Sequence, residues 1–394
     1  MKIIPYGKHH ITDEDIAAVV ETLRSNNLTQ GPKINEFERK FADYVGARYA
    51  VAVSNATAGL HISVEALKSV NKNSEPMRVI VTPMTFAASA NCVRYCGGEV
   101  EFCDIDPRTY LMDTAKLERM LESAPAGHYS GIVVVDFAGY PHKMEEVRRI
   151  ADRFGVWVIE DACHAPGAEW TDSKGVRHLT GSGAWADCTV FSFHPVKHIA
   201  TGEGGMVVTD NETLYCKLQF YRTHGIERDP ELMSRNDGGW YYEMQGLGFN
   251  YRLTDIQAAL GLSQLERAAK GLERRREIAR RYDEAFAGIE GITIPWRDKD
   301  SAHAFHLYVI QVPDRKKVYD RLREHGIYAQ VHYVPVHMMP YYKALGSKEG
   351  NLPVVEEYYC HCLSLPMYPT LTDEEQDYVI RQVIDAVNVT QQHQ

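Results

Sequence analysis

Apolar stretches alternate with amphipathic ones along the N-terminal half of the chain. Short apolar runs without internal polarity predict buried strands, whereas apolar residues repeating every three or four positions predict helices. Buried strands that alternate with helices are typical of a mostly parallel sheet covered on both faces. The predicted strands are 49–53, 79–81, 131–136 and 156–160, and the predicted helices are 58–67, 86–95 and 143–154.

Helix signals precede this alternating region. Thr12 and Asp15 form a capping-box pattern, which predicts a helix that continues to Arg24. A second amphipathic helix is predicted to stop at Gly46, because glycine readily adopts the left-handed conformation found at helix ends.

The pattern changes after Leu253, where two long helical stretches follow one another. From about His303 the remainder predicts a smaller mixture of strands and helices. We therefore expect two domains. A large α/β domain with an N-terminal arm covers 1–265, and 266–394 contains a linking long helix and a small C-terminal α+β domain.

Composition narrows the classes of protein. Of the 394 residues 44% are hydrophobic and 24% charged, the balance of an ordinary globular protein. The formal net charge of -10 argues against nucleic-acid binding, which requires clustered basic residues. There is no leader-like segment and no apolar run of bilayer length, so we expect a cytoplasmic protein without membrane contacts.

Cysteine and histidine spacing offers no metal motif. None of the eight cysteines forms the CxxC pair that is typical of zinc sites, so we expect reduced thiols in the core. The closest histidine groups, His303 with His306 and His332 with His337, fall in predicted strand or loop and lack a helical frame. The sequence therefore predicts no metal centre.

A lysine follows the end of a predicted strand. The strand reaches Phe193, Pro195 interrupts it, and Lys197 comes next in a loop that continues to Gly205. Open α/β folds bind ligands outside the carboxyl ends of their strands. A lysine held there among apolar groups has a lowered pKa and can attack a carbonyl carbon. A lone surface lysine is the alternative, so the hypothesis depends on neighbouring features.

Two adjacent carboxylates end the predicted strand 156–160. Side chains alternate along a strand, so Glu160 and Asp161 point to opposite faces and one can enter a site at the strand end. Pyridoxal 5'-phosphate (PLP) stores electrons only while its pyridine nitrogen is protonated, and a nearby carboxylate keeps that proton in place. We assign this role to Asp161, with His164 near the ring. A helix cap and a structural histidine are the alternatives.

Small residues join the first predicted strand to the next helix. The segment 54–59, Ser-Asn-Ala-Thr-Ala-Gly, places N–H groups and a helix dipole where a phosphate can bind. Ser192 could add a hydroxyl to the same phosphate, although such turns are common without a ligand. Phe86 follows another strand end, where its ring either stacks on a flat cofactor or packs in the core.

These features occur in the order that a PLP site requires: phosphate cradle, stacking ring, carboxylate, hydroxyl and lysine. Two other chemistries lack their motifs. The chain has neither the GxSxG elbow of a serine hydrolase nor the GxGxxG fingerprint of a dinucleotide-binding dehydrogenase. The sequence therefore favours a PLP enzyme with Lys197 as its reactive amine.

Several segments resemble the DegT/DnrJ/EryC1/StrS family of sugar aminotransferases. They are 54–57 (SNAT), 160–164 (EDACH), 192–197 (SFHPVK), 202–205 (GEGG) and 248–257 (GFNYRLTDIQ). The resemblance extends over essentially the whole chain. Three further segments resemble the branch of the family that acts in pseudaminic acid biosynthesis: 223–226, 240–243 and 329–337.

The resemblance implies the type I aminotransferase fold, in which a large α/β domain with a mixed seven-stranded sheet carries a small C-terminal α+β domain. It also implies PLP as cofactor and a homodimer whose subunits share the active sites. Lys197 would form the Schiff base with PLP, and Asp161 would pair with its pyridinium. Other implied cofactor contacts are Ala56, Thr57, Ser192 and the neighbouring subunit's Asn250 at the phosphate, and Phe86 and His164 at the ring. Implied substrate contacts are Tyr6, Asn26, Asn27, Thr29, Gln330, Val331, His332 and Tyr333.

The implied reaction moves the amino group of L-glutamate to the 4-keto position of a UDP-linked 4-keto-6-deoxy-N-acetyl amino sugar and leaves 2-oxoglutarate. Three alternatives stay open: an aminotransferase for another nucleotide keto sugar, such as a perosamine type, a PLP-dependent sugar dehydratase, and a non-catalytic regulatory homologue. Family members that act as dehydratases carry histidine in place of the lysine, so Lys197 favours transamination. Many relatives have glutamine at the position of His164.

Overall fold

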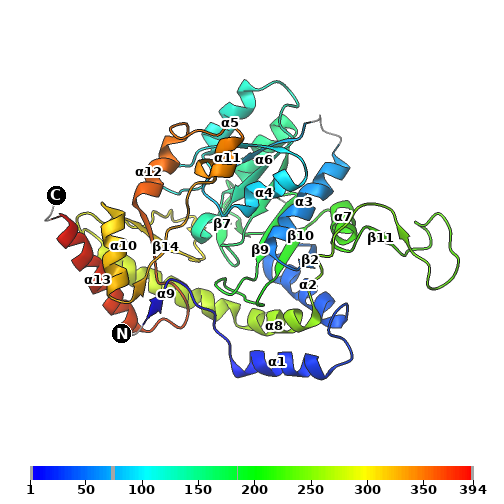
Figure 1. Ribbon diagram of the computed structural model, residues 1–394, viewed down its shortest axis with the longest axis horizontal. Helices are drawn as coiled ribbons and strands as arrows, with labels where there is room; N and C mark the ends of the chain where they lie inside the picture. Colours follow the sequence, from blue (N-terminus) through cyan, green and yellow to red (C-terminus); the bar gives the residue numbers. More distant parts are fainter. Residues whose placement is uncertain (1–2, 72–75, 184, 392–394) are drawn as a thin grey trace.

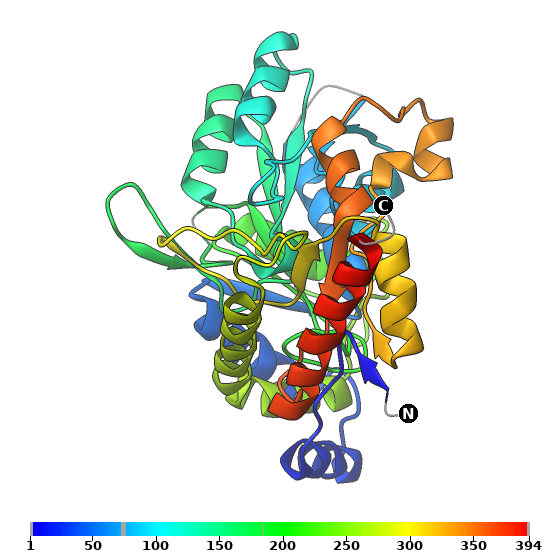
Figure 2. The same cartoon turned by 90° about the vertical axis from the view of Figure 1, so that its left-hand side faces the viewer.

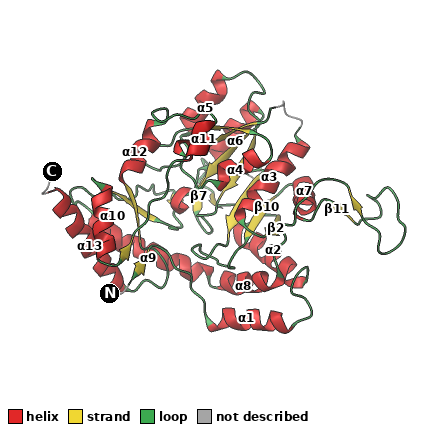
Figure 3. Ribbon diagram, viewed as in Figure 1, coloured by secondary structure: helices red, strands yellow, loops and turns green. Residues whose placement is uncertain are grey.

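The computed structural model describes residues 3–71, 76–183 and 185–391. A mixed seven-stranded sheet carries helices on both faces, and a smaller unit of helices and short strands lies beside it (Figure 1). Colouring by secondary structure shows the strands of the sheet enclosed by helices (Figure 3). The expected α/β fold with a large mixed sheet is confirmed.

Seven strands form the main sheet. They are β2 (Tyr49–Val53), β3 (Arg78–Val81), β4 (Glu99–Phe102), β5 (Gly131–Val135), β6 (Trp157–Asp161), β9 (Cys188–Ser192) and β10 (Gly205–Thr209). Their order is β2-β10-β9-β6-β5-β3-β4, with β10 antiparallel to both neighbours and the rest parallel. Central strands such as β5 are buried along their whole length, which explains why they consist of apolar runs. The predicted strand ends are shifted by one residue, since β6 includes Asp161.

Helices cover the two faces of the sheet. One face carries α3 (Ala56–Val70), α4 (Ala88–Tyr95) and α7 (Glu212–Arg222), and the other carries α2 (Pro32–Val45), α5 (Thr114–Ser123), α6 (Met144–Phe154) and α8 (Asp255–Glu266). Alternate residues of β2 confirm the two-sided burial, because Val51 and Val53 pack toward α3 while Ala50 and Ala52 pack toward α2. The helix α1 (Asp13–Arg24) lies against α8.

Local signals explain where several helices begin and end. The carboxylate of Asp15 accepts the N–H of Thr12 at 3.0 Å, as the predicted capping box requires. At the end of α2, Gly46 takes a φ of 77°, the left-handed conformation that glycine adopts without a steric penalty.

The C-terminal unit has its own apolar core. It contains α9 (Ala268–Phe286), β14 (Tyr308–Gln311), α10 (Arg315–Glu324), β15 (Ile327–Tyr328), β16 (Cys362–Leu365) and α13 (Asp373–Gln391). Figure 2 shows α10 and α13 side by side, and the short N-terminal strand β1 (Ile4–Pro5) pairs in parallel with β15. The N-terminal arm therefore reaches the C-terminal unit. The predicted division into 1–265 and 266–394 stays a prediction.

A second arm, distinct from the N-terminal arm, projects from the body of the molecule (Figure 1). It carries the short strands β11 (Ile226–Glu227) and β12 (Glu243–Met244), and it exposes Trp240 and Leu247 at 76% each. Within the described ranges no helix combines the length and apolarity needed to cross a membrane. The other short elements are η1 (Phe137–Gly139), β7 (Glu169–Thr171), β8 (Arg177–Leu179), β13 (Ser301–Ala302), η2 (Val336–Met338), α11 (Pro340–Ala344) and α12 (Pro353–His361).

Candidate active site

Lys197 lies in the loop that follows β9. Its N–H donates to the carbonyl of His194 at 2.8 Å, and its amine Nζ lies 3.5 Å from Nε2 of His306. Burial lowers the pKa of the Lys197 amine, although the nearby Cys163 and Asp161 act in the opposite direction. A lysine with a lowered pKa loses its proton more readily, so this amine can act as a nucleophile or a base.

Asp161 is the last residue of β6, and both oxygens of its buried carboxyl group accept hydrogen bonds. Oδ2 accepts from the hydroxyl of Ser89 at 2.5 Å, and Oδ1 accepts from the N–H of Cys163 at 3.1 Å. Ser89 has one hydroxyl proton and donates it to the carboxylate, so the hydroxyl of Thr85, 2.6 Å away, donates to Ser89. This chain of hydroxyl groups fixes the orientation of the carboxylate.

His164 lies between Tyr333 and His306. Its Nδ1 accepts the N–H of Ala138 at 3.2 Å, so the ring proton resides on Nε2 and is donated to the hydroxyl of Tyr333, also at 3.2 Å. Burial lowers the pKa of His164 well below its usual value, which keeps the ring neutral at pH 7. Because the Tyr333 oxygen accepts this bond, its own proton is available for a ligand.

The N-terminus of α3 meets the start of β10. The side chain of Asn55 caps the helix, and the first-turn N–H groups of Ala56 and Thr57 have no carbonyl within the helix to bond. A Cβ at Gly205 would lie 2.7 Å from the nitrogen of Ala56, so only glycine permits this close approach. Ser192 pairs with Gly205 in the sheet. The fold thus collects two free amide groups and a hydroxyl at one helix N-terminus, where a phosphate is stabilised.

The N-terminal arm brings Tyr6 toward four predicted substrate contacts, namely Gln330, Val331, His332 and Tyr333. The rings of Tyr6 and His332 lie 5.1 Å apart, and Nδ1 of His332 is 2.8 Å from the hydroxyl of Ser364. Burial lowers the pKa of His332 to about 3. Gln330 is held by backbone hydrogen bonds to Ser364. These residues therefore form a neutral aromatic and polar wall beside His164.

Two predicted cofactor contacts are exposed. Phe86 follows β3 and is 63% exposed, and its ring centre lies 6.2 Å from that of Tyr333. Asn250 is also exposed and pairs through its backbone with Thr223. The open ring of Phe86 is accessible for stacking, and the side chain of Asn250 is accessible to solvent.

Three predicted substrate contacts, Asn26, Asn27 and Thr29, lie elsewhere. They are exposed in the loop between α1 and α2, and Thr29 forms a backbone bridge with Thr254 at the start of α8. In the part of the chain that the structure describes, no hydrogen bond or ring contact joins them to Lys197. The predicted residues are thus one group around Lys197 and a second group, defined by its exposure, that includes Asn250.

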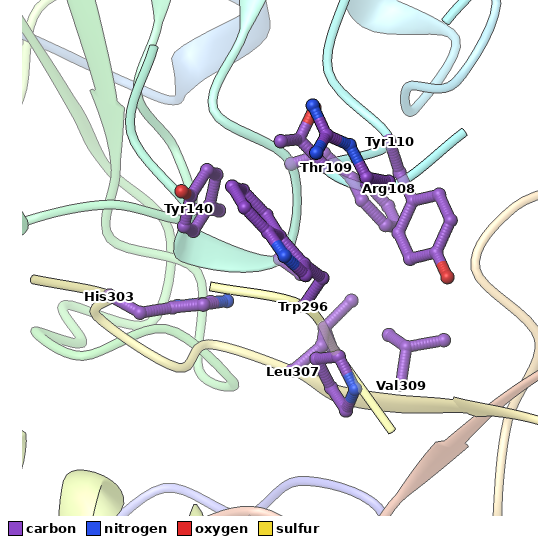
Figure 4. A pocket seen from close by; sticks show the side chains of 11 residues that line it. Arg108, Thr109, Tyr110, Tyr140, Trp296, His303, Leu307 and Val309 are labelled. Atoms are coloured by element: carbon purple, nitrogen blue, oxygen red, sulfur yellow. The ribbon is translucent and has the colours of Figure 1, made fainter. Parts of the chain in front are cut away.

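A small cavity lies where the segment 295–303 crosses the large domain (Figure 4). The guanidinium of Arg108 lies 4.9 Å from the ring centre of Trp296, and the ring of Tyr140 lies between those of Trp296 and His303 at 6.3 and 5.6 Å. The cavity volume is about 20 Å³, which is room for a single water molecule. This cavity is too small for a sugar nucleotide.

Three residues of the site, Thr85, Ser89 and His306, were not predicted from the sequence. Thr85 and Ser89 are spaced four positions apart after a strand end, but isolated hydroxyl residues carry no recognisable signal. His306 was considered only as a metal ligand, whereas its ring centre lies 4.3 Å from that of His164 and its Nδ1 is buried without a partner among the described residues. Long-range packing places all three, so only the folded chain reveals them.

The chain is similar to known aminotransferases along nearly its whole length. The DegT/DnrJ/EryC1/StrS aminotransferase family model matches residues 9–384. The spore coat polysaccharide biosynthesis protein SpsC of Bacillus subtilis is 40% identical over 392 residues, covering 98% of this chain and 97% of that protein. The UDP-4-amino-4,6-dideoxy-N-acetyl-beta-L-altrosamine transaminase of Campylobacter jejuni is 35% identical over 383 residues, 96% of each chain.

Solved structures give the same result. Helicobacter pylori PseC, an aminotransferase involved in the biosynthesis of pseudoaminic acid, has a TM-score of 0.89 at 29% identity and covers 98% of this chain and 100% of its own. Streptococcus pneumoniae Spr1654 in its PMP form has a TM-score of 0.88 at 29% identity, with 98% and 99% covered.

A mixed seven-stranded sheet with this C-terminal unit is the fold of the PLP-dependent sugar aminotransferases. The chain belongs to the DegT/DnrJ/EryC1/StrS aminotransferase family. The family and the enzyme class predicted from the motifs are confirmed.

Proposed function

We propose that the protein transfers the amino group of L-glutamate to the 4-keto position of a UDP-linked 4-keto-6-deoxy-N-acetyl amino sugar, with PLP as cofactor. One observation carries the proposal: a lysine amine with a lowered pKa lies in the same site as a carboxylate oriented by Ser89. The names of the Campylobacter jejuni and Helicobacter pylori relatives support the sugar class.

The donors and acceptors fit the chemical parts of PLP. Lys197 would hold it covalently, Asp161 would face the pyridine nitrogen, and the amide groups of Ala56 and Thr57 with the Ser192 hydroxyl would hold the phosphate. His164 and Phe86 would flank the ring. PLP, when bound, withdraws electrons from the amino donor and so acidifies the proton on its α-carbon.

The Lys197 amine moves the protons. Because burial favours its neutral form, Nζ would accept the α-proton of L-glutamate once the donor's amine has displaced it from the cofactor. The amino group would stay with the cofactor, and water would supply the keto oxygen of the 2-oxoglutarate that leaves. In the second half of the reaction Nζ delivers a proton to C4 of the keto sugar. The neighbouring ring of His306 is neutral, because burial lowers its pKa well below the usual value, so it can accept a hydrogen bond from the amine. The wall of Tyr6, His332 and Tyr333 would orient the sugar.

The second, exposed group of predicted residues supports a homodimer with shared sites. Asn250 is exposed, and the adjoining arm exposes Trp240 and Leu247. Mixing Lys197→Ala with Asn250→Ala subunits tests this, because half of the sites in a mixed dimer are intact. Activity should recover to about a quarter of the wild-type value. No recovery, together with a monomeric mass by light scattering, would contradict shared sites.

A different nucleotide keto sugar is the second candidate. SpsC, whose name refers to spore coat polysaccharide, shares a higher sequence identity with this chain (40%) than the altrosamine transaminase does (35%).

The eight cysteines are free thiols, which supports a reducing, cytoplasmic location.

The decisive test is incubation of the purified protein with L-glutamate and a panel of 4-keto nucleotide sugars, followed by mass analysis. We expect an aminated UDP sugar and one equivalent of 2-oxoglutarate, and Lys197→Ala should lose this turnover. A dehydrated sugar would identify a dehydratase, and an unchanged panel would identify a non-catalytic homologue. Either result would overturn the proposal.

A further inference from the structure

His61, Glu65 and Cys96 form a triad of ligand atoms on the face of the sheet that carries α3 and α4. One atom from each residue lies within 4.8 Å of the other two, and in the described ranges no other group of three or more His, Cys, Asp or Glu side chains comes so close. We propose that this triad binds Zn²⁺, or a divalent transition metal of similar chemistry, in a structural role separate from the Lys197 site.

The backbone holds the three residues in place. His61 and Glu65 are four positions apart on α3, so their side chains leave the same face of the helix. Cys96 follows α4, which packs against α3, and its carbonyl accepts a hydrogen bond from the Lys68 amine at 3.1 Å. His61 and Cys96 are only 7% and 5% exposed, whereas Glu65 is half-buried. Packing therefore fixes the side chains of His61 and Cys96, whereas the half-buried side chain of Glu65 can change its conformation.

The histidine ring is oriented as in many metal sites. The hydroxyl of Tyr251 lies 3.1 Å from Nδ1 of His61, and the ring of Phe249 packs against the imidazole with centres 4.5 Å apart. Metal-bound histidines commonly donate the second ring N–H to such a partner, which fixes the tautomer. Tyr251 can accept the Nδ1 proton, which leaves the lone pair of Nε2 for a metal.

Charge balance favours a divalent ion. A cysteine thiol without a metal ordinarily keeps its proton at pH 7, since its usual pKa is about 8.5. On binding, the S–H bond breaks, the proton leaves to solvent, and the thiolate forms a bond to the metal. One thiolate and one carboxylate then neutralise the two positive charges, so the buried assembly carries no net charge.

The ligand types indicate which ion fits. Thiolate and imidazole favour zinc over magnesium or calcium, which prefer oxygen ligands. Three protein ligands leave a fourth tetrahedral position for water. Metal bonds of about 2.0–2.3 Å require the three atoms to move closer together, and rotation of the half-buried Glu65 side chain can provide this.

The triad adjoins the predicted phosphate cradle. The carbonyl of Tyr251 accepts the N–H of Ser54 at 2.8 Å, and Asn250 precedes Tyr251 in the chain. A metal that fixes His61 would therefore stabilise the segment 249–252 against α3. The expected effect of the metal is on the stability of the protein and does not depend on which substrate binds.

The test is a calorimetric titration with Zn²⁺ of the PLP-loaded protein from which metal ions have been removed. We expect one equivalent of Zn²⁺ to bind and one proton to be released, the latter measured from the dependence of the binding enthalpy on the buffer. Glu65→Gln and Cys96→Ser should each weaken binding at least tenfold, while the matched control Cys216→Ser, at an exposed cysteine, should bind as the wild type does.

Tyr251→Phe separates a positioning role from a packing role. Loss of a hydrogen bond to a metal-bound histidine should weaken Zn²⁺ binding about 10–100-fold, while the aromatic packing remains. Glu65→Gln is nearly isosteric and half-buried, so it should fold, and Zn²⁺ should raise the melting temperature of the wild type but not of this variant. Absence of binding to the wild type, or equal affinity of Glu65→Gln and Cys96→Ser with the wild type, would overturn the proposal.

Discussion

Two neighbouring acids at the end of β6 lie in opposite environments. Asp161 faces α4, where the Ser89 hydroxyl and the N–H of Cys163 donate to its two oxygens. Glu160 faces the other side of the sheet, where it meets a second buried acid, Asp136. The first environment supplies hydrogen-bond donors, and the second adds another carboxyl group. Which face a side chain enters therefore decides its chemistry, although the two residues are adjacent in sequence.

Asp136 and Glu160 form what we call the far-side acid pair. Burial raises the pKa of Asp136 to about 8 and that of Glu160 well above its usual value. Thr189 donates to Glu160 at 2.8 Å and the N–H of His142 donates to Asp136 at 2.9 Å. Oδ2 of Asp136 and Oε1 of Glu160 have no donor among the described residues, and a proton shared between the acids would satisfy both.

Exchanging Asp161 and Glu160, each for its amide, should give the largest difference in kcat/KM. Asp161→Asn should lower kcat/KM by about 10²–10⁴-fold, because the carboxylate proposed to face the cofactor loses its charge. Glu160→Gln should change kcat/KM by less than about tenfold, since Glu160 faces the opposite side of the sheet from the proposed site and an amide fills nearly the same volume. Initial rates with L-glutamate and the keto sugar measure both. Equal losses in the two variants would remove the contrast between the faces.

Removing the donor to Asp161 should have the next largest effect. Ser89→Ala leaves a buried carboxylate oxygen without its hydrogen bond, which costs about 1–3 kcal/mol in the free energy of unfolding. Urea denaturation measures this cost. The control is Ser69→Ala, at an exposed serine of α3 whose hydroxyl bonds only a helix carbonyl, and it should change stability by less than about 0.5 kcal/mol. A similar loss in both variants would contradict the role of Ser89.

The far-side acid pair should make stability fall as the pH rises. A folded-state pKa of about 8 means that the folded protein binds more protons than the unfolded chain, so the free energy of unfolding declines until that pH is passed. The decline reaches at most about 1.4 kcal/mol per pH unit. Buried histidines with lowered pKa values, such as His142, act in the opposite direction near pH 6.5, because the unfolded chain still protonates them in part there. The difference between the wild type and an Asp136 variant, measured from about pH 6.5 to 8, therefore isolates the effect of the acid pair.

Asp136→Asn is the variant for this measurement. It should lose less stability than the wild type between the two ends of that pH window, as measured by urea denaturation at each pH. Parallel pH profiles for the two proteins would show that the acid pair holds no extra proton.

Thr85→Val should have the smallest effect. It removes the outer hydroxyl while Ser89 still donates to Asp161, so the cost should be about 0.5–1.5 kcal/mol. A loss larger than that of Ser89→Ala, in the same denaturation assay, would mean that Thr85 acts independently of the carboxylate.

Much of the fold could be predicted from local patterns. The alternation of apolar runs and amphipathic stretches predicts β2, β3, β5, β6 and β9 but not β4 or β10, and Gly46 ends α2 as expected. The ends of elements shifted by one or two residues, as where β6 extends to Asp161, because the last residue of a strand is set by pairing with its neighbours. The motif around Lys197 predicts the family, since its residues are consecutive in the chain.

The surroundings of the motif residues could not be predicted in the same way. Ser89 lies 72 positions from the carboxylate it contacts, and His306 lies 109 positions from Lys197. The exposure of Asn250 likewise depends on how the tertiary fold packs around it. Contacts between residues so distant in the chain cannot be predicted from the local sequence.

By itself, the sequence determined several strands and helices of the large domain, the lysine after β9 and the acids at the end of β6, because each depends on residues close together in the chain. Only the tertiary structure decided that Asp161 receives two hydrogen-bond donors while Glu160 meets another acid, and that the tautomer of His164 is fixed by Ala138. The physical reason is that desolvation and hydrogen bonding act through space. Residues distant in the chain set the charge and orientation of each catalytic group.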